Sequence, residues 1–182
     1  IDTVDGVYGE DLIVGAGRGD VLSGGAANDA IYGGAGPEST ASFVSTYDEE
    51  GVRYDPFGNV LPEADDLIYG EDGDDYLSGS AGHDDIYGGV GNDTLEGGTG
   101  FDKLYGEDGD DTLNGGSDQD HLWGGDGEDT MNGGSGHDTL YGDAGEDGMG
   151  GGSGDDALLG GADNDNLRGG SGADVLYGDA GN

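Results

Sequence analysis

The sequence contains no cysteine, which excludes a disulfide framework and any thiolate metal site. Only 4 Lys and Arg stand against 42 Asp and Glu, so the formal net charge is -38. A surface of this charge repels nucleic acid, anionic membranes and acidic polysaccharides unless bound cations bridge them. No apolar run approaches the roughly 18 residues that a membrane span needs, so direct membrane insertion is not expected.

Hydrophobic residues are also few. They make up 31% of the chain, whereas glycine alone contributes 46 residues. A chain with this little apolar surface and this much self-repulsion cannot build an ordinary globular core, and it stays expanded unless cations neutralise it. We therefore expect the chain to be unfolded without bound cations and to fold cooperatively with them.

What the sequence does contain is a repeat of nine residues that continues from Gly70 to the end. Its form is G-G-x-G-x-D-x-U-x, where U is aliphatic, as in GGVGNDTLE at 88–96 and GGSGHDTLY at 133–141. Earlier copies begin at Gly6, Gly15, Gly24 and Gly33, and a degenerate copy begins at 61. A fixed period of this kind predicts a solenoid, in which each unit is stable only against its neighbours.

Each part of the repeat has a physical role. Closely spaced glycines allow positive φ angles that turn backbone carbonyls toward one point. The x-U-x segment is a minimal strand with U on the inner face. Two repeats therefore form one coil, and turns 18 residues apart stack in two columns, with about 4.8 Å between coils.

The sixth position of the repeat is aspartate in every copy except one, which has Glu38. Stacked aspartates can hold a hard cation between successive turns, with glycine-turn carbonyls as further ligands. An all-oxygen shell of six to eight ligands suits calcium better than the strict octahedron of magnesium. The candidate ligands are Asp11, Asp20, Asp29, Asp66, Asp75, Asp84, Asp93, Asp102, Asp111, Asp120, Asp129, Asp138, Asp147, Asp156, Asp165 and Asp174.

This repeat resembles that of the RTX (repeats-in-toxin) family of calcium-binding proteins. The resemblance implies an all-β fold, a right-handed parallel β-roll or β-solenoid, with stacked calcium ions in the turns on both sides. It also implies bacterial export, usually by a type I system, and folding outside the cell. Some copies depart from the pattern, and weaker or distorted sites are expected there. The departures are Arg18, Ala27, Glu38, Asp118 and Asp163.

The repeat pattern divides the chain into three parts. Residues 1–41 form a first repeat block, 42–60 interrupt the register, and 61–182 form the main roll, which stops inside a repeat. The interruption could fold as a hairpin against the roll or serve as a docking loop for a partner. Because the sequence starts without a signal-like segment and stops within a repeat, we expect it to be a piece of a longer or processed protein.

Two outward rows could contact partners. One sheet carries aromatic residues at the ninth position of alternate repeats, and these either stabilise the sheet or bind a protein or glycan. The other sheet carries a short threonine row at Thr94, Thr112 and Thr130, an arrangement found in ice-binding solenoids but too short here to favour that function. The aromatic row comprises Tyr69, Tyr87, Tyr105, Trp123, Tyr141 and, after Leu159, Tyr177.

The sequence does not favour catalysis. No nucleophile, base and orienting group stand at a believable spacing, and His83 and His137 are three coils apart.

The leading hypothesis is a calcium-dependent structural module of a secreted or cell-surface bacterial protein, such as a surface layer, adhesin or matrix spacer. The alternative is the non-catalytic export and folding module of an extracellular protease, lipase or epimerase.

Overall fold

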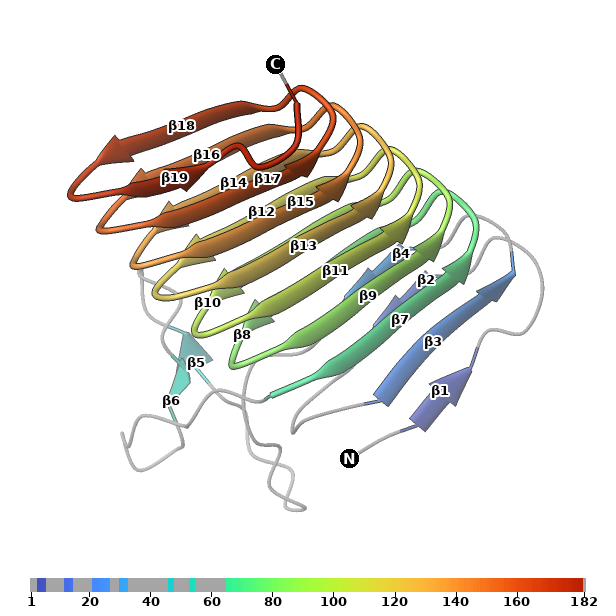
Figure 1. The fold of residues 1–182 in the computed structure, drawn as a ribbon. Helices are drawn as coiled ribbons and strands as arrows, with labels where there is room; N and C mark the ends of the chain where they lie inside the picture. The colour runs from blue at the N-terminus through green and yellow to red at the C-terminus, as the bar shows by residue number, and fades with distance from the viewer. Residues whose placement is uncertain are drawn as a thin grey trace.

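The computed structural model describes residues 65–181 as one continuous stretch, together with short strands earlier in the chain. Those earlier strands lie at 3–5, 12–14, 21–26, 30–32, 46–47 and 53–54. All regular structure in these residues is β, and the strands stack into a solenoid with two parallel sheets (Figure 1).

The first sheet, here called the odd sheet, follows the order β1-β3-β7-β9-β11-β13-β15-β17-β19. All its strands run parallel. Their bounds are β1 (Thr3–Asp5), β3 (Val21–Ala26), β7 (Leu67–Asp72), β9 (Asp85–Val90), β11 (Lys103–Asp108), β13 (His121–Asp126), β15 (Thr139–Ala144), β17 (Ala157–Ala162) and β19 (Val175–Tyr177).

The second sheet, here called the even sheet, has the order β18-β16-β14-β12-β10-β8-β4-β2 and is also parallel. The chain alternates between the two sheets, so each coil contributes one strand to each. The bounds are β2 (Leu12–Val14), β4 (Ala30–Tyr32), β8 (Tyr76–Ala81), β10 (Thr94–Thr99), β12 (Thr112–Ser117), β14 (Thr130–Ser135), β16 (Gly148–Ser153) and β18 (Asn166–Ser171).

From β7 onward, paired strands are 18 residues apart, as in the pairing of Leu95 with Leu113. This confirms two repeats per coil. The spacing changes once in each sheet, to 46 residues: β3 pairs directly with β7, where Leu22 faces Ile68, and β4 pairs directly with β8. The chain between β4 and β7 is therefore 28 residues longer than the regular register of 18 residues requires.

Within that segment, β5 (Thr46–Tyr47) and β6 (Arg53–Tyr54) pair antiparallel, as the two arms of a hairpin do. No role for this hairpin follows from the pairing alone. Its use as a docking loop, and the three-part division of the chain, remain predictions.

The core is a double row of aliphatic side chains between the two sheets. The eighth position of the repeat points inward, as predicted, and is fully or almost fully buried through most of the described roll. In the last coils Leu167 is only partly buried and Leu176 is 42% exposed, because β18 and β19 are the terminal strands of their sheets. The core residues are Ile13, Leu22, Ile31, Ile68, Leu77, Ile86, Leu95, Leu104, Leu113, Leu122, Met131, Leu140, Met149 and Leu158.

The strands are longer than the three-residue x-U-x segment that the sequence predicts. Each full strand has six residues and continues through the first three positions of the next repeat, as in β9. The turn is correspondingly short, and between β9 and β10 it consists of Gly91, Asn92 and Asp93. The first-position glycine is therefore part of the strand, where it is buried beside the aliphatic row, as at Gly88.

Candidate metal sites

From Asp66 onward, each sixth-position aspartate is the last residue of a turn, directly before a strand. Those before odd strands form one column and those before even strands form the other, as the 18-residue register requires. From Asp66 to Asp156 these aspartates are at most 4% exposed. Asp165 and Asp174 lie in the last coils and are half-buried, while Asp11, Asp20 and Asp29 lie outside the described residues.

One oxygen of each stacked carboxylate is used for a contact between coils. The backbone N–H of Asp84 donates to Oδ1 of Asp102 at 2.9 Å, and the N–H of Asp102 donates to Oδ1 of Asp120 at 2.9 Å. The other column has the same contact, for example from Asp93 to Asp111 at 2.7 Å. From Asp84 to Asp174, each of these aspartates thus links its own turn to the turn one coil earlier.

The second oxygen of the carboxylate, Oδ2, is buried and has no hydrogen-bond partner. A buried carboxylate oxygen without a donor or a counter-charge is strongly unfavourable, since the charge loses its hydration and gains nothing in return. Its regular recurrence indicates a ligand supplied from outside the chain. The residues with this oxygen are Asp84, Asp93, Asp102, Asp111, Asp120, Asp129, Asp138, Asp147, Asp156 and Asp165.

Backbone carbonyls approach the same oxygen. A Cβ atom placed on Gly88 would lie 2.5 Å from Oδ2 of Asp93 and 2.7 Å from the carbonyl oxygen of Gly106, one coil later. The carboxylate oxygen and the carbonyl therefore flank one point that only glycine leaves open. The same pattern recurs at Gly97, Gly115, Gly133 and Gly151.

This donor set fits calcium. No three His, Asp or Glu side chains converge on a common point in the part of the chain that the structure describes. Further ligands at each turn must therefore come largely from backbone carbonyls, which calcium accepts readily in a flexible all-oxygen shell. A bound calcium ion would supply the positive charge that the buried Oδ2 atoms lack.

Burial also changes the acidity of these groups. It raises the pKa of Asp84 and of Asp120 from the ordinary 3.8 to about 8, although each carboxylate accepts a backbone hydrogen bond that lowers it. The pKa of Asp129 rises to about 7 for the same reason. Neighbouring aspartates of the same column raise these pKa values further. Because these pKa values lie near neutral pH, protons and metal ions compete for the carboxylates.

The two aspartates that replace the fourth-position glycine keep the left-handed backbone of the turn. Asp118 has φ 76° and Asp163 has φ 74°, where glycines such as Gly109 and Gly127 have φ 142° and 149°. The turn therefore retains its handedness with a different φ. Whether calcium binds more weakly there stays a prediction, and Arg18, Ala27 and Glu38 lie outside the described residues.

A second ladder of side chains, which sequence reasoning missed, stands at the fifth position of the turn. The N–H of Asp110 donates to Oδ1 of Asn92 at 3.1 Å, and the N–H of Phe101 donates to Nδ1 of His83 at 2.8 Å. The direction is opposite to that of the sixth-position ladder, because here the acceptor belongs to the earlier coil. The sequence feature from which this ladder could have been predicted is the frequent occurrence of Asp, Asn, His and Glu at the fifth position.

The aromatic row of the odd sheet is a continuous stack. Ring centroids lie 5.0 Å apart for Tyr69 and Tyr87, 4.6 Å for Tyr87 and Tyr105, 4.5 Å for Tyr105 and Trp123, and 5.4 Å for Trp123 and Tyr141. The rings are within 17° of parallel. Since the inner rings cover one another's faces, stacking between coils is their observed contact. Binding of a protein or glycan to this row remains a prediction.

Comparison with known families agrees with this geometry. The family model of the RTX calcium-binding nonapeptide repeat matches most of the chain, at residues 5–37, 63–95, 87–122, 114–149, 123–158 and 150–182. The chain belongs to the RTX calcium-binding nonapeptide repeat family. Residues 38–62, which include the β5–β6 hairpin, fall outside the matched stretches. No curated protein matches the chain.

Membership of the RTX family identifies calcium as the metal and the roll as a calcium-binding structural fold. RTX repeats are characteristic of secreted bacterial proteins. Among the residues that the structure describes, there is no helix with the length and apolar character to cross a membrane.

Proposed function

We propose that the chain is a calcium-dependent structural or assembly module of a secreted or cell-surface bacterial RTX protein. Suitable roles are a stiff spacer or assembly surface in a surface layer, an adhesin or an extracellular matrix. The observation that carries the proposal is the row of buried Oδ2 atoms without hydrogen-bond partners. These atoms make the folded roll unfavourable without a cation and favourable with one.

The residues that would hold calcium are the sixth-position aspartates of both columns, with carbonyls of the glycine-rich turns. Calcium would supply positive charge between buried carboxylates and would join successive coils. Because parallel ladders run the length of both sheets, each ion would stiffen a rod in which every coil contacts only its neighbours. Such a rod suits a spacer that forms only where calcium is plentiful.

The alternative is the non-catalytic export and folding module of an extracellular enzyme of the protease, lipase or epimerase type. It is favoured by the same dependence on calcium, since a chain that stays unfolded at low calcium can be exported, for example through a type I system, and then fold outside. A catalytic domain in the flanking sequence would favour this alternative. Further repeats or adhesive domains would favour the spacer.

The test is calcium-driven folding. Far-UV circular dichroism in excess EGTA should show an expanded chain, and addition of calcium should produce cooperative β structure. Titration calorimetry should then count several ions per chain. Magnesium at the same concentration is the matched control and should fail to fold the chain, because its strict octahedron does not suit carbonyl-rich turns. Full β structure in EGTA at about pH 8 would refute the proposal.

A further inference from the structure

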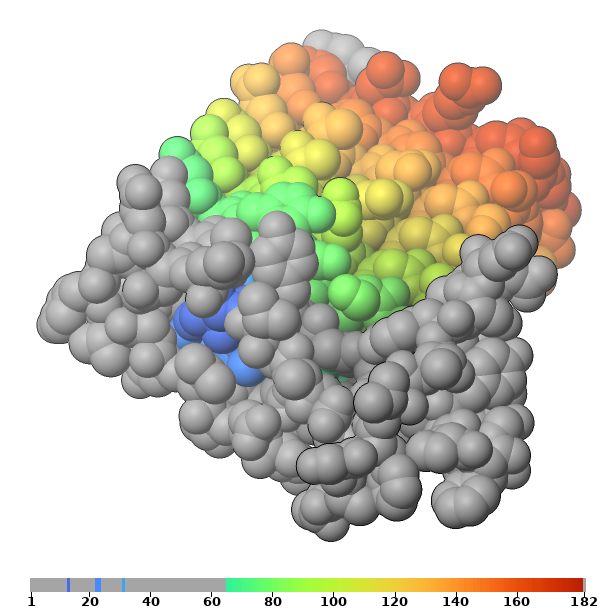
Figure 2. Space-filling view, turned by 180° about the vertical axis from the view of Figure 1, so that it is seen from behind, coloured from blue at the N-terminus to red at the C-terminus, as the bar shows by residue number. Residues whose placement is uncertain are grey.

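The outer side of the even sheet is almost free of charge in a chain with 42 acidic residues. Strands β12, β14, β16 and β18 contain no Asp or Glu. By contrast, β7, β9, β11, β13 and β15 of the odd sheet each contain at least one. Figure 2, which views the molecule from behind, shows a broad surface coloured from green to red on this side. We call the outer side of β10 to β18 of the even sheet the even face.

Two opposite charges mark the ends of the even face. The pairing register places Glu96, Asn114, Asn132, Gly150 and Arg168 in one row across the five strands. Asn132 is the centre of this row, with Glu96 two strands before it and Arg168 two strands after it. Arg168 is exposed, and it forms no ion pair with any residue in the described part of the chain.

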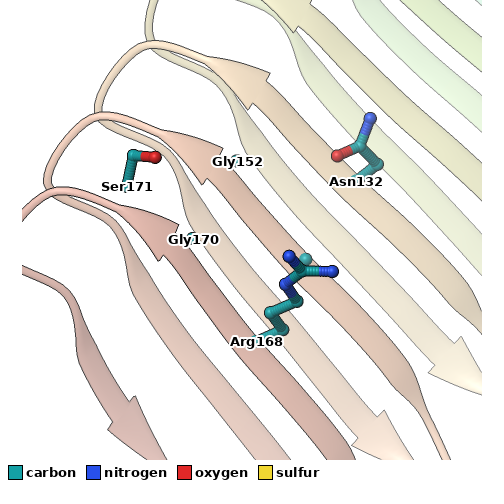
Figure 3. Close-up of a pocket in the computed structure, with 6 residues that line it drawn as sticks. Asn132, Gly152, Arg168, Gly170 and Ser171 are labelled. Atoms are coloured by element: carbon teal, nitrogen blue, oxygen red, sulfur yellow. The ribbon is translucent and has the colours of Figure 1, made fainter.

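The even face also has a gap at β16, where Gly148 and Gly150 carry no side chain. The gap is a depression of about 300 Å³ beside Arg168 (Figure 3). A Cβ on Gly148 or on Gly150 would meet no atom closer than 3.8 Å, and neither residue has a positive φ. Other described glycines from Gly70 to Gly172 either have a positive φ or would clash through a Cβ. The fold therefore does not require glycine at these two positions.

We propose that the even face is a self-association surface on which a second copy of this chain packs face to face. The two-fold axis runs parallel to β14 and passes through Asn132. The rotation leaves each residue at the same position along the strand direction but reverses the order of the strands across the face. Both copies therefore use the same surface, so the interface is isologous. Arg168 then faces the partner's Glu96, and the same pair forms a second time by symmetry.

The same rotation fills the gap. Asn114, one strand before the axis, faces the partner's Gly150, and Thr112 faces the partner's Gly148. At each of these two positions, a side chain of one copy thus lies opposite a glycine of the other copy. The threonines and asparagines are uncharged, so two strongly acidic molecules can touch here without placing carboxylates against each other.

The size of the even face predicts weak association. Five strands about 4.8 Å apart, with six residues of about 3.3 Å each, cover roughly 20 by 20 Å. This is about 400 Å² per copy, or half of the roughly 800 Å² per partner of a standard stable interface. Acidic turns border the face on both sides, so the proposal rests on the calcium-dependent fold, in which bound calcium neutralises them.

The first experiment is sedimentation equilibrium of the calcium-loaded chain from about 10 µM to about 1 mM, with folding followed by circular dichroism. A monomer–dimer equilibrium is expected. A chain that folds with calcium but remains monomeric throughout would overturn the self-association and leave the proposed function intact. Failure to fold with calcium would overturn both, so the two failures are distinguishable.

Charge reversal tests the pairing itself. R168E places two acidic side chains against each other at each end of the interface, and E96R places two basic side chains together. Each variant alone should therefore dimerise about tenfold more weakly or worse. An equimolar mixture of the two variants should recover a heterodimer, because one copy then carries acidic residues at both positions and the other carries basic ones. K103E on the odd sheet has the same change in charge as R168E and should have no comparable effect. If the mixture stays as weak as its components, the two-fold arrangement is wrong.

The gap gives an independent test. G150Q adds a side chain where a Cβ meets only ordinary contacts, so the monomer should fold as before. The added side chain should displace the partner's Asn114 and weaken the dimer about tenfold. Dimerisation that survives G150Q and R168E but is lost on substitution of Trp123 would place the interface on the odd sheet and refute the proposal.

Discussion

The backbone N–H of Asp102 donates to Oδ1 of Asp120 at 2.9 Å, whereas Oδ2 of Asp120 is buried without a hydrogen-bond partner. One oxygen of the carboxylate therefore joins two coils, and the other is left for a ligand that the chain does not supply. Because the arrangement repeats along both columns, a change at one turn should disturb the coils on either side of it.

Asp120→Asn should weaken calcium binding in the middle of the roll. The amide keeps an oxygen that can accept from Asp102, but it removes the charge that calcium neutralises. We expect a higher calcium midpoint for folding and a loss of about 2–5 kcal/mol in the free energy of unfolding in saturating calcium. Circular dichroism during calcium titration and urea unfolding measures both.

The control for that substitution is Asp126→Asn. It makes the same change in charge, but Asp126 is exposed at the end of β13. Its calcium midpoint should stay near that of the unmodified chain. Equal effects of the two substitutions would mean that total charge, and not the buried carboxylate, controls folding.

Gly97→Ala should be strongly destabilising. The added Cβ would lie 2.5 Å from Oδ2 of Asp102 and 2.6 Å from the carbonyl oxygen of Gly115, so it would occupy space at the proposed calcium site. A loss of about 1–3 kcal/mol from overpacking is expected, with a raised calcium midpoint in addition. Thermal and urea unfolding in calcium would measure the loss.

Gly150→Ala is the matched control, since its Cβ meets nothing closer than 3.8 Å. Replacing a strand glycine in ordinary backbone geometry should be neutral or should stabilise by about 0.5–1 kcal/mol. If both alanine variants lost stability equally, the steric account of the first-position glycine would be incorrect.

Acid should favour the fold when calcium is absent. Burial raises the pKa of Asp84 and Asp120 to about 8 and of Asp93 to about 6, above the ordinary 3.8. The protonated carboxyl is therefore preferred in the fold. This contribution to stability is fully present below about pH 4 and is lost as the pH rises through about 6 to 8.

In EGTA, β structure measured by circular dichroism should consequently increase between pH 8 and pH 5. Calcium affinity should change in the opposite sense, since protons compete for the same oxygens, and the calcium midpoint should be higher at pH 5 than at pH 8. Spectra in EGTA that were identical at both pH values would contradict the burial of these carboxylates.

Trp123→Ala should weaken the aromatic stack, because Trp123 contacts Tyr105 on one side and Tyr141 on the other. Each stacked pair contributes about 0.5–1.5 kcal/mol beyond burial, so a loss of about 1–3 kcal/mol is expected in urea unfolding. Trp123→Tyr keeps a ring in the stack and should cost less than half as much. If Trp123→Ala left the free energy of unfolding unchanged, the aromatic row would have no stabilising role.

Several features were predictable because the repeat is periodic. The 18-residue register follows from two repeats per coil, and it correctly places Leu95 beside Leu113 and Asp93 in the column of Asp111. The aliphatic eighth position is buried because side chains alternate along a strand. Any sequence with this period that forms such a coil must have the same 18-residue register and the same inward-facing eighth position.

Other features depended on contacts between coils. The sequence predicts strands of three residues, but each full strand has six, because the buried first-position glycine continues the hydrogen-bonded ladder. No local sequence pattern shows this continuation. The fifth-position ladder, as from Asp110 to Asn92, requires two turns to be stacked before the contact exists. The direct pairing of β3 with β7 likewise depends on where the chain rejoins the roll, since 46 residues separate the paired Leu22 and Ile68.

The order of residues alone was enough to determine the coil, its aliphatic core and the two aspartate columns, because a strict period of nine allows few other ways to bury the one aliphatic residue of each repeat. Only the tertiary structure decided how each carboxylate is used. The stacking of coils brings a donor to Oδ1 and none to Oδ2, and this division of one side chain is the physical reason why we expect the roll to require calcium.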